Sequence, residues 1–148
     1  MSLAQTQSVA LLGLDGHVVG VEVDIADGLP GYSLLGLPDA ALSESRDRVR
    51  SAIVNCGEVW PNRKVTVSLS PAWLPKSGSS FDLAICISLL SAHETVPAEK
   101  IAEIVFLGEL SLDGRIRSVR GVLPALIAAF KAGVTTAVVP AENLKEAQ

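Results

Sequence analysis

The sequence predicts an α+β fold, α/β-like in its alternation, in which helices pack on a mixed β-sheet. Strand-like runs with a two-residue period recur along the chain, and helix-like runs separate them. Apolar residues make up 49% of the chain and aromatic residues only 4%, so Val, Leu, Ile and Ala must build most of the core. With 148 residues, we expect positions 1–148 to form a single domain.

Alternating or β-rich patterns predict strands in the first half over residues 8–13, 18–26, 32–37 and 64–70. Asp15-Gly16 is a favoured hairpin dipeptide, so we expect the first turn there. A helix is predicted over 39–56, with Leu42, Ser45, Val49, Ala52 and Ile53 on one face. The charged residues at positions 44–50 are interpreted as a mixed, solvated face.

The segment 79–92 is apolar almost all round, which predicts a buried helix. Ser79, with Asp82 three residues later, resembles a capping box at its start. Further strands are expected over 104–107, 110–112, 115–119 and 135–139, and helices over 121–132 and 141–148. Because the last helix runs into the end of the chain, we expect a fragment of a longer protein.

Several functional classes are disfavoured by composition and spacing. The formal charge of −4 argues against a strongly basic nucleic-acid-binding surface. Cys56 and Cys86 lack ligand spacing and are expected to be buried free thiols, and neither His17 nor His93 has a ligand-spaced companion, so no metal site is expected. No P-loop is present. No run approaches the ~20 apolar residues of a membrane span, so we expect a cytoplasmic protein without membrane contact.

Two stretches carry most of the functional information. Pro75-Lys76-Ser77-Gly78-Ser79-Ser80-Phe81-Asp82-Leu83 is a polar loop that leads into the buried helix. Gly108-Glu109-Leu110-Ser111-Leu112-Asp113-Gly114-Arg115-Ile116-Arg117 precedes the next helix. Together they resemble the Lon proteolytic domain, which implies a Lon-like fold, also described as ribosomal-protein domain-2-like. In this resemblance Ser80 occupies the position of the Lon nucleophile, and Leu123 occupies the position of the catalytic lysine.

A further pair of segments narrows the resemblance. One is Gly36-Leu37-Pro38-Asp39-Ala40 with Glu44-Ser45-Arg46-Asp47-Arg48-Val49-Arg50, and the other is Gly78-x-x-Phe81-Asp82-Leu83. Both resemble the amino-terminal domain of the ComM/YifB proteins, which are magnesium chelatase-like AAA+ ATPases. The resemblance implies a downstream AAA+ domain that binds ATP and Mg, and assembly of the full-length protein into a homo-oligomeric ring. It also implies a role in DNA processing, namely branch migration during natural transformation.

Catalysis by this chain itself is not expected. A Ser-Lys mechanism needs an amine that can be unprotonated beside the hydroxyl, and Leu123 cannot supply one. The guanidinium of Arg120 stays protonated, and Lys76 lies on the approach loop. We therefore expect no catalytic residues and no cofactor in this chain. The alternative is a hydrolase that uses Ser80 with an unrecognised base, whereas a small-ligand site near Gly78 has no positive evidence.

Arg115, Arg117 and Arg120 cluster around a predicted turn, and other loops are bounded by Arg63, Lys64 and Lys76. If these loops converge, their charges could neutralise a few phosphates of DNA or contact a protein partner. Aromatic residues do not interleave with these basic residues, so base stacking is not supported. Ordinary solvated loop charges are the alternative.

Overall fold

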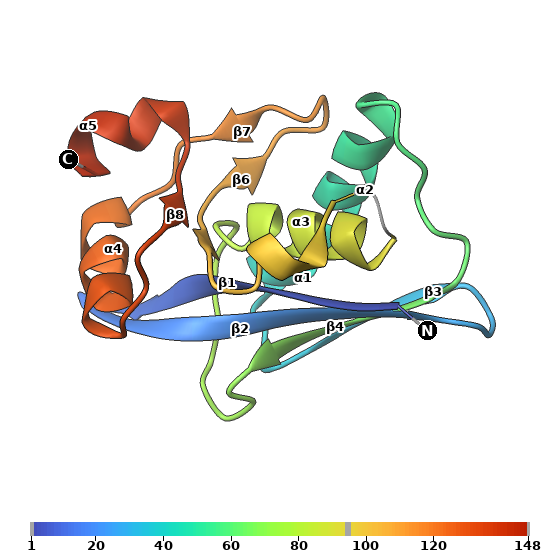
Figure 1. Ribbon diagram of the computed structural model, residues 1–148, viewed down its shortest axis with the longest axis horizontal. Coiled ribbons are helices and arrows are strands. Elements are labelled where there is room, and N and C mark those ends of the chain that lie inside the picture. The colour runs from blue at the N-terminus through green and yellow to red at the C-terminus, as the bar shows by residue number, and fades with distance from the viewer. Residues whose placement is uncertain (1, 94–95, 148) are drawn as a thin grey trace.

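The computed structural model describes residues 2–93 and 96–147, and its centre is a mixed six-stranded sheet (Figure 1). The strand order is β3-β4-β2-β1-β5-β8. These strands are β1 (Ser2–Leu12), β2 (Asp15–Ala26), β3 (Gly31–Leu35), β4 (Lys64–Ser70), β5 (Val105–Phe106) and β8 (Ala137–Val138). The β1–β2 and β2–β4 pairs are antiparallel, whereas β3–β4, β1–β5 and β5–β8 are parallel. The predicted fold class, a mixed sheet with packed helices, is confirmed.

The helices are α1 (Ala40–Ser43), α2 (Ser45–Asn55), α3 (Asp82–Ala92), α4 (Val122–Lys131) and α5 (Leu144–Ala147), with the 3-10 turns η1 (Ala98–Lys100) and η2 (Ala141–Asn143). A separate two-stranded ribbon joins β6 (Glu109–Leu110) to β7 (Ile116–Arg117). Within the described ranges, no helix combines the length and apolarity needed to cross a membrane.

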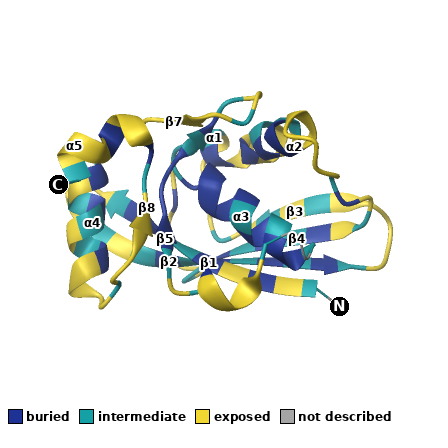
Figure 2. Ribbon diagram, turned by 45° about the horizontal axis from the view of Figure 1, so that its top comes forward, coloured by how far each residue is buried: buried dark blue, intermediate teal, exposed yellow. Residues whose placement is uncertain are grey.

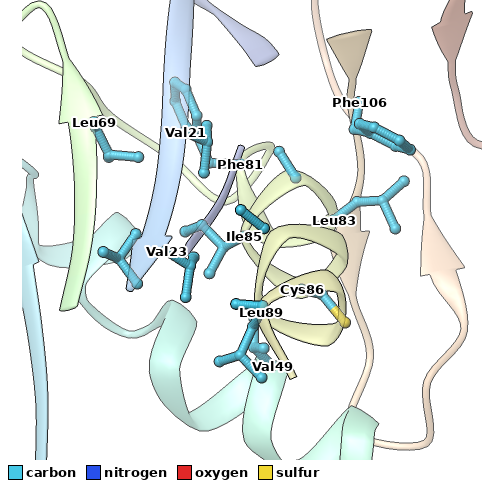
Figure 3. Packing of buried hydrophobic residues seen from close by; sticks show 14 of the residues in the cluster. Val21, Val23, Val49, Leu69, Phe81, Leu83, Ile85, Cys86, Leu89 and Phe106 are labelled. Carbon is cyan, nitrogen blue, oxygen red and sulfur yellow. The ribbon is translucent and has the colours of Figure 1, made fainter. Parts of the chain in front are cut away.

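The main core lies between the sheet and helices α2 and α3. This cluster includes Val21 and Val23 of β2, Ile85 and Leu89 of α3, and Val49 of α2. Figure 3 shows Val23 beside Ile85 and Leu89 beside Val49. These side chains are fully buried. In β2 this follows from the period-two pattern, which places every second residue on the face that the helices cover. A second cluster joins Val9 of β1 to Ala125 and Ala129 of α4.

The first hairpin differs from the sequence prediction. Leu12 pairs with Asp15, so the two-residue turn is Gly13-Leu14, with Gly13 at φ 66°, and the turn predicted at Asp15-Gly16 is wrong. Gly16 lies in β2 instead, where a Cβ atom would approach the Cβ of Ala128 to 2.5 Å. The close contact with α4 therefore explains this glycine. β1 also begins earlier than predicted, since Ser2 pairs with Ile25.

The helix predicted over 39–56 is two helices that meet at Glu44. Asp39 caps α1, because its Oδ1 accepts a hydrogen bond from the backbone N–H of Leu42 at 2.8 Å. The predicted apolar face of this segment is confirmed, since Leu42, Ser45, Val49, Ala52 and Ile53 are all buried.

The buried helix predicted over 79–92 begins three residues later, at Asp82. No side-chain hydrogen bond caps its start, so the predicted capping box of Ser79 and Asp82 is wrong. Figure 2 shows α3 almost entirely buried, which confirms the prediction for its body. Cys86 on this helix is buried as expected, whereas Cys56 at the end of α2 is exposed, contrary to expectation.

Candidate functional site

The two Lon-like stretches lie side by side in the fold. The backbone N–H of Gly108 donates to the carbonyl of Ser80 at 3.0 Å, and Leu83 N–H donates to the carbonyl of Gly108 at 3.1 Å. A Cβ atom on Gly108 would lie 2.7 Å from Cγ2 of Ile116, so a larger residue here would have to displace that side chain.

A cavity of about 390 Å³ opens beside this junction, and we call it the serine-loop pocket. Residues 77–80 form one wall, residues 118–121 form another, and Val9 and Leu11 of β1 contribute apolar surface. Ser80, Glu109 and Arg120 all line it. Neither lysine nor histidine is among the described residues of its lining.

Residues 77–80, which we call the serine loop, are held by hydrogen bonds to the turn that follows β3. The carboxylate of Asp39, besides capping α1, accepts a hydrogen bond from the backbone N–H of Gly78, 3.2 Å from its Oδ1. The Asp39 N–H donates to the carbonyl of Lys76 at 3.0 Å, and the Lys76 N–H donates to that of Leu37 at 3.1 Å. One carboxylate therefore fixes both a helix start and the loop that carries Ser80.

Lys76 is buried, with 1% of its surface exposed, and its Nζ donates to the backbone carbonyls of Leu69, at 3.0 Å, and Pro71. Desolvation lowers the pKa of Lys76. An ammonium enclosed by the β4–loop backbone is out of reach of a phosphate, so the prediction of Lys76 as a nucleic-acid or partner contact is wrong.

Asp82, the first residue of α3, is fully buried and pairs with Arg48 of α2. Arg48 donates from Nε to Asp82 Oδ2 at 2.6 Å and from Nη2 to Oδ1 at 3.0 Å. The backbone N–H of Leu110 also donates to Oδ2, at 3.1 Å. The hydrogen bond that Arg48 donates to the Asp82 carboxylate raises the pKa of Arg48. This pair joins α2, α3 and β6, and Asp82 follows Ser80 by two residues.

The Arg48–Asp82 pair is absent from the sequence predictions. Arg48 is predicted to lie on a solvated face, whereas its side chain is only 17% exposed. Asp82 is the residue from which such a pair can be predicted. A carboxylate on an otherwise apolar, buried helix requires a cation and hydrogen-bond donors.

The remaining candidate residues are dispersed. Leu123 lies in the first turn of α4, is 46% exposed and does not line the serine-loop pocket. Arg115 and Arg117 line a second hollow, of about 650 Å³, with Glu142, whereas Arg120 belongs to the serine-loop pocket. Arg115 also pairs with Asp113 at 3.4 Å. The three arginines are exposed but line two different hollows.

The mixed sheet brings the two Lon-like stretches together around the serine loop, so the chain has a Lon-like fold. A Lon protease 2 from Herpetosiphon aurantiacus is accordingly 29% identical over 139 residues, which is 88% of this chain and 17% of that protein. Residues 21–143 match the family profile described as subunit ChlI of Mg-chelatase.

Relatives with higher sequence identity show to which group within this family the chain belongs. A Mycobacterium tuberculosis protein without an assigned function is 56% identical over 99% of this chain. YifB of Escherichia coli is 45% identical over 90%, and the competence protein ComM of Haemophilus influenzae is 44% identical over 88%. The chain belongs to the Mg-chelatase ChlI family and to its ComM/YifB group, as its motifs predicted. It spans 26–29% of the length of these relatives.

Proposed function

We propose that this chain is a non-catalytic domain at the amino-terminal end of a longer ComM-like AAA+ ATPase that processes DNA. In that protein it helps to assemble a homo-oligomeric ring or guides DNA or a protein partner into the ring. The observation that carries the proposal is the serine-loop pocket, where Ser80 is present without a lysine or histidine in the described lining.

The positions of the nearby amines support a non-catalytic role. A serine nucleophile needs a neighbouring base that can take its proton. The Nζ of Lys76 is committed to two backbone carbonyls, and Leu123 has no amine. Arg120 lines the pocket, but a guanidinium group is not a base that could take the proton of a serine.

The role in a longer protein is supported by the relatives. They are more than three times as long as this chain, and one of them is named a competence protein. ATP and Mg would be bound by the downstream AAA+ domain, which is the first expected partner of this chain. Arg115, Arg117 and Arg120 stay candidates for DNA or partner contact, since all three are exposed.

The direct test uses the Haemophilus influenzae ComM relative in three forms: intact, without its matching segment, and with that segment replaced by this chain. We expect the deletion to lower DNA-stimulated ATP hydrolysis or to prevent ring assembly measured by light scattering, and the replacement to restore what is lost. Equal ATP hydrolysis and equal mass in all three forms would contradict an accessory role.

A serine hydrolase is the second candidate function, because Glu109 shares the pocket with Ser80 and could act as a base. Cleavage of fluorogenic peptides and unfolded casein by the chain and by its Ser80→Ala variant separates the two. We expect no cleavage above background from either protein. Cleavage by the unsubstituted chain that disappears in Ser80→Ala would establish the hydrolase instead.

A further inference from the structure

A third pocket, which shares no lining residue with the two hollows described above, combines positive charge with aromatic rings. It has a volume of about 400 Å³ and is formed by the start of β3, the outer side of α2 and the segment that precedes β4. Figure 1 shows that segment running from the end of α2 down to β4. We call this cavity the arginine–aromatic pocket and define it by Tyr32, Arg46, Arg50, Trp60 and Arg63.

Three guanidinium groups line this pocket. Arg46 and Arg50 are four residues apart and share one side of α2, while Arg63 comes from the segment before β4. Like charges at this helix spacing repel one another. An anion bound between them would relieve that repulsion and could accept paired hydrogen bonds from the guanidinium groups.

The neighbouring carboxylates leave the arginines of this pocket available to an anionic ligand. Asp47 pairs with Arg46 at 3.3 Å and Asp27 pairs with Arg63 at 3.0 Å, but these carboxylates are 75% and 99% exposed. Such exposed pairs contribute little free energy, so a phosphate can compete for the guanidinium groups. Arg50 forms no ion pair with any residue in the described parts of the chain.

Two aromatic side chains line the same space. The ring centroids of Tyr32 and Trp60 are 6.1 Å apart, with their planes tilted by 33°. The Tyr32 hydroxyl is buried, and this burial raises its pKa to about 12. Both rings are partly buried and pack against the main core, and the part of the indole that lines the pocket would stack on a flat heterocycle.

The three arginines and two aromatic rings together indicate which class of ligand the pocket would bind. Inorganic phosphate or a lipid headgroup would use the arginines but not the rings, whereas a nucleobase linked to phosphate would use both. The hollows that contain Arg115, Arg117 and Arg120 have no aromatic residue in their described linings. We propose that the arginine–aromatic pocket binds a nucleotide unit, a phosphate ester carrying a base, either as a free nucleotide or within a single strand of nucleic acid.

The inference rests on the proposed function in that both involve nucleic acid, but the two can fail separately. Nucleotide binding is measured on this chain, whereas the accessory role is measured in the longer relative. A chain that binds no nucleotide could still restore ring assembly, and a chain that binds could still fail to restore it.

The first experiment uses Trp60 as the reporter. In a Trp73→Phe variant Trp60 is the only tryptophan, and its fluorescence is followed during titration with a short oligothymidylate, with thymidine monophosphate and with inorganic phosphate. We expect saturable quenching by the oligonucleotide or the mononucleotide. Tighter binding of the oligonucleotide indicates a strand, and equal binding indicates a free nucleotide. No saturable quenching, or equal binding of inorganic phosphate, would overturn the proposal.

The second experiment removes the pocket's contacts and measures the anisotropy of a labelled oligothymidylate. We expect Arg50→Ala to weaken binding roughly fivefold or more and Trp60→Leu to weaken it by a similar factor, with Trp60→Phe recovering part of the loss. Lys100→Ala, which removes an exposed cation in η1, is the matched control and should stay within about twofold of the unsubstituted chain. Circular dichroism checks that each variant is folded.

A double variant distinguishes this pocket from the surface predicted by sequence. If Arg115→Ala/Arg117→Ala abolishes binding while Arg50→Ala and Trp60→Leu leave it unchanged, the nucleotide contact lies on the β6–β7 ribbon and the proposal is wrong. If the double variant retains binding that Arg50→Ala weakens, the arginine–aromatic pocket is supported.

Discussion

Asp82 shows how one buried carboxylate connects segments distant in sequence. It accepts hydrogen bonds from Arg48, 34 residues earlier, and from the backbone of Leu110, 28 residues later. Each of these residues belongs to a different family motif: the charged helix, the serine-loop stretch and the second Lon-like stretch. The motifs therefore meet because their polar groups satisfy one another inside the protein.

Removal of Arg48 should leave an uncompensated buried charge. We expect Arg48→Ala to lower the free energy of unfolding by about 3–5 kcal/mol, and Arg48→Met combined with Asp82→Leu to recover much of that loss, because an apolar pair needs no desolvated ion. Urea unfolding followed by circular dichroism measures both. An Arg48→Ala loss of only about 0–1 kcal/mol, the range for exposed ion pairs, would show that the pair is solvated.

The pH dependence of that loss provides a second check. Burial raises the pKa of the Asp82 carboxyl, while hydrogen bonds from Arg48 and Leu110 oppose the rise. Without Arg48 the raised pKa means that the folded variant holds its proton more tightly than the unfolded chain. The neutral carboxyl then favours folding at low pH, and this contribution is lost as pH rises through the folded pKa. The stability gap to the unsubstituted chain should therefore be larger at pH 7 than at pH 4.

At the scale of secondary-structure elements, the order of strands and helices follows from local patterns, but their ends do not. β5 and β8 are each two residues long where four and five were predicted, since pairing with neighbouring strands decides which residues are extended. The helix predicted over 39–56 divides at Glu44, because Asp39 caps a separate first turn and also holds the serine loop.

Asp39 offers a test at this scale. We expect Asp39→Ala to lower the free energy of unfolding by about 1 kcal/mol through loss of the helix cap, and to accelerate amide hydrogen exchange in residues 77–80. Asp39→Asn is the matched control, because asparagine caps helices well and retains an oxygen for Gly78 N–H. Equal stability and equal exchange of the two variants would show that the side chain holds neither element.

At the scale of the whole molecule, the serine-loop pocket exists only because segments from β1, the serine loop, Glu109 and the start of α4 converge. The left-handed conformation of Gly121, at φ 76°, begins α4 beside Leu11, whose Cδ1 would lie 2.4 Å from an added Cβ. Ser80 and Arg120 share the pocket for this reason, although 40 positions separate them in the chain. Leu123, three residues further along, is left facing outward and half exposed.

The sequence by itself determined the fold class, the buried faces of β2 and α3, and membership of the ComM/YifB group. These depend on the period of apolar residues and on short motifs, which are local properties of the chain. Only the tertiary structure decided the burial of Lys76, the pairing of Arg48 with Asp82, and the meeting of Trp60 and Tyr32 with three arginines. Each of these depends on which distant segments become neighbours, and a side chain's solvation, charge partners and accessible ligands are set by those neighbours.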